Sequence, residues 1–203
     1  YFEMFGNRGI YNDGSTPTGN ATLAIVRSTF SGNQAPTVSS FGGAVENDGY
    51  DHGTATLTIR GTTFSDNSAH DRGGAIQNYT DLAGHATVQI ANCTFKGNSA
   101  PLGAGAINNS RLDGTGVAGI EIANTIFDAG ATGGTIGNIN GSVASLGFNL
   151  ASDAVDGDAT TGPGGFLNAA TDRRNTDPLL GALADNGGPT LTHAPLPGSP
   201  AVD

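Results

Sequence analysis

Acidic, basic and imidazole side chains recur in three polar segments spaced about 30 residues apart. These side chains are Asp51, His52, Asp81, His85, Arg111 and Asp113. Two carboxylates about 5 Å or about 6.5–9.5 Å apart can hydrolyse a glycosidic bond. A base beside an arginine or a cation suits elimination from an acidic sugar. If the fold gathers these segments on one flank, they predict a polysaccharide lyase or glycoside hydrolase site; otherwise they are solvated loop residues.

A second set of polar residues could bind a ligand without reacting with it. Glu46, Gln77 and Asn108 occupy equivalent places in three similar segments, each one residue after a buried apolar position. Side chains of these types can hydrogen-bond sugar hydroxyls. The wet face of an ordinary strand would show the same residue types, so both interpretations stay open.

Three aspartates near the C-terminal end are candidates for a structural calcium ion. Asp153, Asp156 and Asp158 lie in a glycine-containing loop, and calcium prefers such oxygen ligands. Their spacing departs from the EF-hand pattern, and no other cofactor is expected from the sequence.

The elements that must position these residues come from a repeat. Four phenylalanines, Phe30, Phe64, Phe95 and Phe127, are 34, 31 and 32 residues apart. The first three begin a Phe-x-x-Asn motif, and each of the four is followed by a Gly-Gly-Ala-Ile-like segment (42–45, 73–76, 104–107 and 133–136). A repeat of this length predicts a stacked solenoid.

Each repeat contains three short candidate strands and no helical pattern. Stretches such as Thr56–Ile59 alternate polar and apolar residues, which is typical of a strand with one buried face. We therefore predict an all-β, right-handed parallel β-helix of about five coils, with an antiparallel sandwich or barrel as the structural rival. The four phenylalanines should stack inside, and Asn33, Asn67 and Asn98 should form a corner in left-handed backbone, with Gly130 as the fourth equivalent.

Two further columns follow from this register. Cys93 aligns with Ser28, Thr62 and Thr125, which predicts a small packed residue rather than a reactive thiol. A second column, Thr29, Thr63 and Thr94, should point outward beside Ser31 and Ser65. It suggests an ice-binding face, but Lys96 and Ile126 interrupt that surface.

Composition and charge exclude several classes of protein. The chain has 203 residues, 33 glycines and a net charge of −10, so it should repel nucleic acid and anionic membranes. No apolar run is long enough to cross a bilayer, so we expect no membrane insertion. The period ends near residue 150, and five of the nine prolines lie between Pro178 and Pro200. We predict a β-helix over residues 1–150 and an irregular segment over 151–203, packed on the solenoid as a cap.

The paired Gly-Gly-Ala-Ile and Phe-x-x-Asn motifs resemble those of polymorphic outer-membrane-protein β-helices. The stretches 145–150, 175–181, 185–193 and 197–203 resemble the C-terminal part of large secreted, surface-anchored bacterial β-helix proteins. The resemblance implies a secreted or surface-displayed bacterial protein, often an adhesin, of which this chain is a fragment. We therefore expect a non-catalytic, monomeric adhesion or display module whose partner is an extracellular glycan or a host surface, with a polysaccharide-active enzyme as the alternative.

Overall fold

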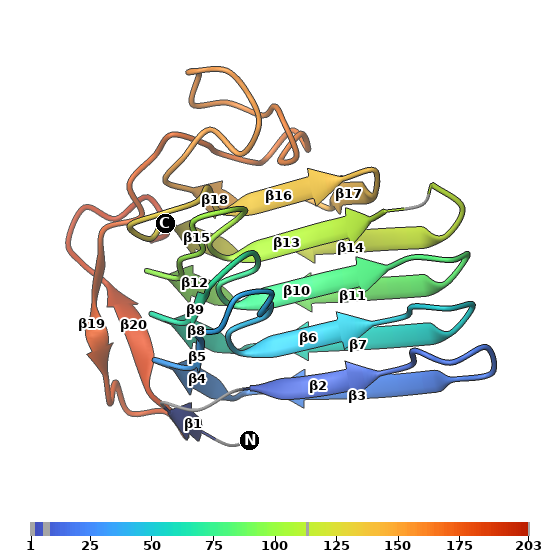
Figure 1. Ribbon diagram of the computed structural model, residues 1–203. Helices are drawn as coiled ribbons and strands as arrows, with labels where there is room; N and C mark the ends of the chain where they lie inside the picture. The colour runs from blue at the N-terminus through green and yellow to red at the C-terminus, as the bar shows by residue number, and fades with distance from the viewer. Residues whose placement is uncertain (1–2, 6–8, 113, 203) are drawn as a thin grey trace.

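The protein is a β-solenoid built from three parallel sheets (Figure 1). The computed structural model describes residues 3–5, 9–112 and 114–202, and these contain no α-helix. Every strand of the solenoid pairs with its equivalents in the coils before and after it. The rival antiparallel sandwich or barrel is thereby excluded, and the expected parallel β-helix is confirmed.

The three sheets correspond to the three strands expected in each repeat. Sheet A carries the phenylalanines and contains β1 (Glu3–Phe5), β4 (Thr29–Ser31), β8 (Thr63–Ser65), β12 (Thr94–Lys96), β15 (Ile126–Asp128) and β18 (Leu150–Ala151). Sheet B follows the glycine pair and contains β2 (Ile10–Asp13), β6 (Val45–Asp48), β10 (Ile76–Thr80), β13 (Ile107–Arg111) and β16 (Ile136–Ile139). Sheet C contains β3 (Asn20–Val26), β7 (Thr54–Arg60), β11 (His85–Ala91), β14 (Val117–Ala123) and β17 (Ser142–Ser145). A short extra pair joins β5 (Gln34–Ala35) to β9 (Ser68–Ala69).

The solenoid makes about four turns, so the predicted coil number of about five was slightly too high. Complete coils begin at β3, β7, β11 and β14. The strands β1 and β2 at one end, and β17 and β18 at the other, belong to incomplete turns. The period of the sequence continues into these partial turns, which is why it suggested one coil more.

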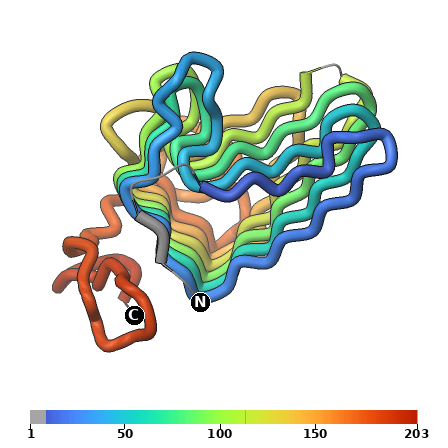
Figure 2. Tube along the Cα trace, turned by 60° about the horizontal axis from the view of Figure 1, so that its bottom comes forward, coloured from blue at the N-terminus to red at the C-terminus, as the bar shows by residue number. Residues whose placement is uncertain are grey.

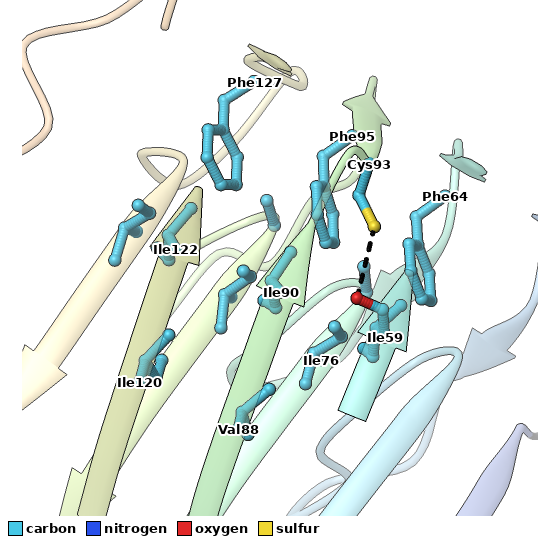
Figure 3. Packing of buried hydrophobic residues seen from close by; sticks show 14 of the residues in the cluster. Ile59, Phe64, Ile76, Val88, Ile90, Cys93, Phe95, Ile120, Ile122 and Phe127 are labelled. Atoms are coloured by element: carbon cyan, nitrogen blue, oxygen red, sulfur yellow. Dashed lines mark hydrogen bonds between the residues drawn. The ribbon is translucent and has the colours of Figure 1, made fainter. Parts of the chain in front are cut away.

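The core is a set of continuous columns of identical or similar side chains. The rings of Phe30, Phe64, Phe95 and Phe127 are fully buried and stack almost parallel. Successive ring centroids are 5.0, 4.8 and 5.1 Å apart, close to the spacing of paired strands. Columns of isoleucine, leucine and valine from sheets B and C pack against the rings (Figure 3). The predicted internal phenylalanine column is therefore present.

Two ladders of asparagine side chains run through the interior at the corners of the coil. Asn33 donates through Nδ2 to Asn67 Oδ1 over 2.9 Å, and Asn67 donates in the same way to Asn98 over 2.8 Å. A longer ladder follows sheet B through five asparagines: Asn12, Asn47, Asn78, Asn109 and Asn138. Each ladder satisfies amide groups that would be costly to bury alone.

The left-handed backbone at the first corner was assigned to the wrong position. Positive φ occurs one residue before each asparagine, at Gly32, Asp66 and Gly97, and not at the asparagines themselves. Gly130 also has no positive φ; a Cβ there would lie 2.1 Å from the carbonyl oxygen of Asn98. Glycine is therefore required at position 130 by close approach of backbone rather than by handedness.

Cys93 is buried in the small polar column that its spacing predicted. The hydroxyls of Ser28, Thr62 and Thr125 and the Cys93 thiol each donate to the carbonyl two residues earlier, over 2.8–3.2 Å. The Cys93 sulfur also lies 3.8 Å from the Ile59 carbonyl oxygen (Figure 3). Burial raises the pKa of the thiol to about 11, so the reactive thiolate is scarce at neutral pH.

The first part of the C-terminal segment lies on the end of the stack. Val155 and Leu167 close the hydrophobic core beyond β18. The loop around them is organised by Arg174, which is 1 % exposed although it is charged. Its guanidinium donates to the carbonyl oxygens of Ala154, Asp158 and Gly162 and to the side chains of Asp158 and Thr160.

The second part is an antiparallel hairpin of β19 (Leu180–Ala184) and β20 (Thr192–Pro195), which the sequence did not predict. It lies along the side of the solenoid, against the outer face of sheet A, rather than on its end (Figures 1 and 2). Thr29 Oγ1 donates to the Leu191 carbonyl oxygen over 2.7 Å, and His193 Nε2 lies 3.1 Å from Ser65 Oγ. Thr29, Thr63 and Ser65 are buried on this outer face, where Thr29 and Ser65 contact the hairpin, while Ser31 and Thr94 are half-buried, so the expected threonine column is not an open surface.

Candidate functional site

The outer face of sheet B presents two parallel columns of side chains. In β10, Ile76 and Asn78 point inward while Gln77 and Tyr79 point outward, because side chains alternate along a strand. The in-register pairing aligns Glu46, Gln77 and Asn108 in one outward column. It aligns Asp48, Tyr79 and Ser110 in the next.

Three hollows lie in succession along this face. The central one, about 230 Å³, is lined by Phe41, Glu46, Asp48, Arg72, Gln77, Tyr79, Ser110 and Leu112. A second hollow of about 400 Å³ shares Phe41 and Glu46 with it and adds Gly9, Ile10, Tyr11 and Gly42. A third, of about 320 Å³, shares Arg72 and reaches Asn108, Gly137 and Ile139 on β13 and β16. The three hollows share lining residues and follow one another across the five strands of sheet B, parallel to the solenoid axis, and we refer to them together as the groove of sheet B.

One wall of this groove is built by the residues that precede each Gly-Gly pair. Phe41 and Arg72 form a parallel bridge, and the loops that carry them rise beside sheet B (Figure 2). The glycines that follow, Gly42 and Gly73, have φ of 58° and 65°, which a side chain rarely tolerates. In the next coil the equivalent residue is Gly103. A Cβ there would lie 2.6 Å from Arg72 Cγ, so this glycine leaves the room that the arginine stem occupies.

Tyrosines and carboxylates share the end of the groove nearest β2. Tyr11 donates to Asp48 Oδ2 over 2.5 Å, and the Tyr50 amide donates to Asp48 Oδ1 over 2.9 Å. The rings of Tyr50 and Tyr79 stack with centroids 6.2 Å apart. Burial, followed by the charges of Asp81 and Asp48, raises the pKa of Tyr79 to about 12. Burial and the hydrogen bond to Asp48 likewise raise the pKa of Tyr11.

The column chosen from the sequence for ligand binding lies on the groove floor, but two of its members bind each other. Asn108 Nδ2 donates to Gln77 Oε1 over 3.1 Å, and Gln77 Nε2 donates to Ser110 Oγ over 2.8 Å. Both amides are only 2 % exposed. Glu46 is more accessible and lines two of the hollows. The floor is therefore a fixed polar network, and accessible contacts come from Glu46, the tyrosines and the wall.

Five of the six candidate catalytic residues are described, and they lie on the flank beyond sheet B, where the loops of successive coils stack. His52 donates its backbone amide to the Leu82 carbonyl oxygen over 2.9 Å. Asp51 Oδ1 lies 3.2 Å from His52 Nδ1, and Asp81 accepts the Leu82 amide at 2.9 Å. Arg111 donates to the Gly116 carbonyl oxygen over 3.1 Å.

The described flank residues therefore form hydrogen bonds mainly within their own loops. His85 lies at the start of β11, exposed and in register with Thr54 and Val117. Asp113 lies outside the described residues. Asp81 Oδ2 lies 3.5 Å from the Tyr79 hydroxyl, and this contact links the flank to the groove. A catalytic role for the flank stays a prediction.

The calcium candidates already have protein partners. Asp153 accepts from the Thr135 amide and hydroxyl, both at 2.7 Å, and so ties the end loop to the last full coil. Asp158 accepts from Thr160 and Arg174, and these hydrogen bonds lower its pKa to about 2. Asp156 lies between them at a φ of 60°. Within the described ranges, no group of three or more potential metal-binding side chains gathers, and calcium stays a prediction.

Sequence reasoning missed the second outward column and the wall. The strands of sheet B continue past the asparagines at which they were expected to end, so Asp48, Tyr79 and Ser110 also face outward. The signal for the wall was the position before each Gly-Gly pair, where Phe41 and Arg72 align. The second column follows when the in–out alternation of the sheet B strands is extended by two residues beyond Glu46, Gln77 and Asn108. The wall follows when the alignment of the Gly-Gly pairs is extended by one residue toward the N-terminus.

Comparison with known families recognises one segment of the chain. Residues 61–79 match the model of the Chlamydia polymorphic membrane protein (Chlamydia_PMP) repeat. This segment is similar to a polymorphic membrane protein repeat. It extends from the turn before Phe64 to Tyr79, so one repeat supplies both a core ring and part of the groove. Comparison with curated proteins and with solved structures gives no match. No helix in the described part of the chain is long and apolar enough to span a membrane.

Proposed function

We propose that this chain is a non-catalytic module of a secreted or surface-displayed bacterial protein, and that it binds an extracellular glycan along the groove of sheet B. The polymorphic membrane protein repeat supports display at the cell surface. The parallel β-solenoid supports a rigid, extended binding face, as is common for repeat proteins.

The observation that carries the proposal is the succession of three hollows that share lining residues along sheet B. Five strands at about 4.8 Å spacing give a groove about 19 Å long, enough for several sugar units. Tyr79 and Phe41 offer aromatic surface, and Arg72 and Glu46 offer charged hydrogen-bonding groups at the edges. Binding sites for small polar ligands commonly combine these two features.

The fixed floor favours binding over turnover. Gln77, Asn108 and Ser110 satisfy one another, and Asp48 accepts from Tyr11 and Tyr50, so these groups are engaged before any ligand arrives. Such pre-organisation lowers the entropic cost of binding.

One observation favours a hydrolase as the second candidate. Glu46 and Asp48 are two residues apart on one strand and line the same hollow, which places their backbones about 6.6 Å apart. Their side chains project from the same face of the strand, so the two carboxylates can reach the separation of about 6.5–9.5 Å that an inverting glycosidase uses. Release of reducing ends from a panel of neutral and acidic polysaccharides, abolished by Asp48→Asn or Asp81→Ala, would establish this activity.

The binding proposal is tested on a glycan array with the wild-type chain and with Tyr79→Ala and Arg72→Ala. We expect at least one class of oligosaccharide to bind and both variants to weaken its binding by tenfold or more. Gln89→Ala, on the outer face of sheet C, is the matched control and should bind normally. Binding that is equally strong in all variants, or no binding to any glycan, would contradict the proposal, provided that thermal melts show folded proteins.

A further inference from the structure

The groove of sheet B differs in charge between its two ends. Near β2 and β6, Glu46 and Asp48 line the hollows, and Asp13 pairs with Asp48 across the two strands. Asp81 lies against the Tyr79 hydroxyl at the neighbouring strand end. Near β16, Gly137 and Ile139 replace these groups. Among the described residues that line the central hollow, Arg72 is the single basic one, and it stands on the wall.

Aromatic rings surround the acidic end. Tyr11, Tyr50 and Tyr79 all contact Asp48 or stack on one another, and Tyr11 is 52 % exposed. Asp48 is only 7 % exposed and accepts from the Tyr11 hydroxyl and the Tyr50 amide, so it contributes mainly its charge. Glu46 is partly exposed, lines two of the hollows and offers the more accessible carboxylate. Burial and, after it, the neighbouring carboxylates raise the pKa values of Tyr11 and Tyr79, and the second cause agrees with a negative potential here.

A cation with several N–H donors complements this combination of aromatic rings and carboxylates. The faces of aromatic rings attract ammonium groups, and partial burial strengthens that attraction. Carboxylates attract the ammonium electrostatically, and this attraction is stronger beside a protein surface than in free solution. An acidic sugar would meet repulsion from the same groups, with Arg72 alone to offset it.

We propose that this groove binds a glycan that carries free amino groups, and that a sugar ammonium lies at the acidic end near Tyr11, Glu46 and Tyr79. The inference rests on the proposed glycan-binding function and names its ligand class. Arg72 repels ammonium groups from the middle of the groove, so the ammonium that is bound most favourably is the one at the acidic end. The occupant is thus an oligosaccharide of partly or fully de-N-acetylated amino sugars, bound in one direction.

The test is isothermal titration with three probes of equal length: a glucosamine oligomer, its fully N-acetylated counterpart and an oligogalacturonide. We expect the glucosamine oligomer to bind at least tenfold more tightly than the acetylated one, and the oligogalacturonide to bind most weakly. The preference should shrink as salt is raised, because the attraction is electrostatic.

Glu46→Gln and Asp48→Asn remove one charge each with little change in shape. Either should reduce the preference for the glucosamine oligomer at least threefold. Glu121→Gln removes the same charge from the outer face of sheet C and should leave the preference unchanged. An equal effect of Glu121→Gln would reveal non-specific attraction to an acidic protein and overturn the inference.

The remaining outcomes separate the two proposals. If acetylated and free oligomers bind equally and Tyr79→Ala weakens both, glycan binding stands and the amino-sugar inference fails. If tetralysine binds as tightly as the glucosamine oligomer, the groove recognises ammonium groups without the sugar, and the ligand class is wrong. If none of the oligosaccharides binds, the proposed function fails as well.

Discussion

Truncation of Phe64 to alanine tests the stacked core directly. Phe64 is fully buried, and its ring stacks on Phe30 at 5.0 Å and on Phe95 at 4.8 Å. Loss of a buried aromatic side chain costs about 3–5 kcal/mol, including the cavity that remains. Each lost ring pair contributes about 0.5–1.5 kcal/mol of that. In a chain of this size such a loss lowers the melting temperature by about 6–20 °C.

The assay is urea and thermal denaturation followed by circular dichroism. Phe64→Leu keeps much of the apolar volume but loses both ring contacts, so we expect a smaller cost of about 1–3 kcal/mol. Gln89→Ala, an exposed side chain that bonds Glu121 on the next coil, should cost less than about 0.5 kcal/mol. Equal losses for Phe64→Ala and Gln89→Ala, or none for Phe64→Leu, would refute the assignment of stability to the ring column.

Three further perturbations probe other parts of the structure. Asn78→Ala removes the middle of the sheet B ladder and leaves Asn109 Oδ1 and the Ala86 carbonyl oxygen without this donor, so unfolding free energy should fall by about 2–5 kcal/mol in urea titrations. Arg174→Ala should expose the amides of the end loop to hydrogen exchange and lower the unfolding free energy by about 3 kcal/mol or more. Arg173→Ala, a change at the exposed neighbouring residue, should have neither effect. Equal hydrogen exchange in both variants would contradict the role of Arg174. Burial lowers the pKa of His193 below its usual 6.5, so the folded chain binds fewer protons than the unfolded chain between the two pKa values. Stability should therefore decline as the pH falls through about 6.5 toward the folded-state pKa, and His193→Gln should flatten this slope in melts between pH 5 and 8; identical slopes would show that His193 does not titrate on unfolding.

The repeat made the solenoid predictable because each column is specified several times. The phenylalanines, the Cys93 column and the internal asparagines recur at one spacing, and a one-residue slip would turn every apolar side chain outward. The left-handed corner residues were harder to place. Asp66 takes that backbone as Gly32 and Gly97 do, and sequence offers little to separate Asp66 from the neighbouring asparagine.

The groove and the hairpin were less predictable for a different reason. The groove wall depends on loops of unequal length, and Arg72 extends across the place of Gly103 in the next coil. The hairpin is held by contacts between residues far apart in the chain, such as His193 with Ser65. Nothing periodic in the last 50 or so residues specifies where they dock, so local patterns could identify them only as non-repetitive.

Because the strands of sheet B pair in register, the length of its groove can change only by whole coils of the solenoid. Duplication of one 31-residue segment, such as that from Phe64 to Phe95, would insert one coil and lengthen the outer face by about 4.8 Å without altering the existing columns. The hairpin beside sheet A reaches over a fixed number of strands, so it limits how many such insertions it can still cover. Related proteins could therefore match ligands of different lengths by gaining or losing whole coils.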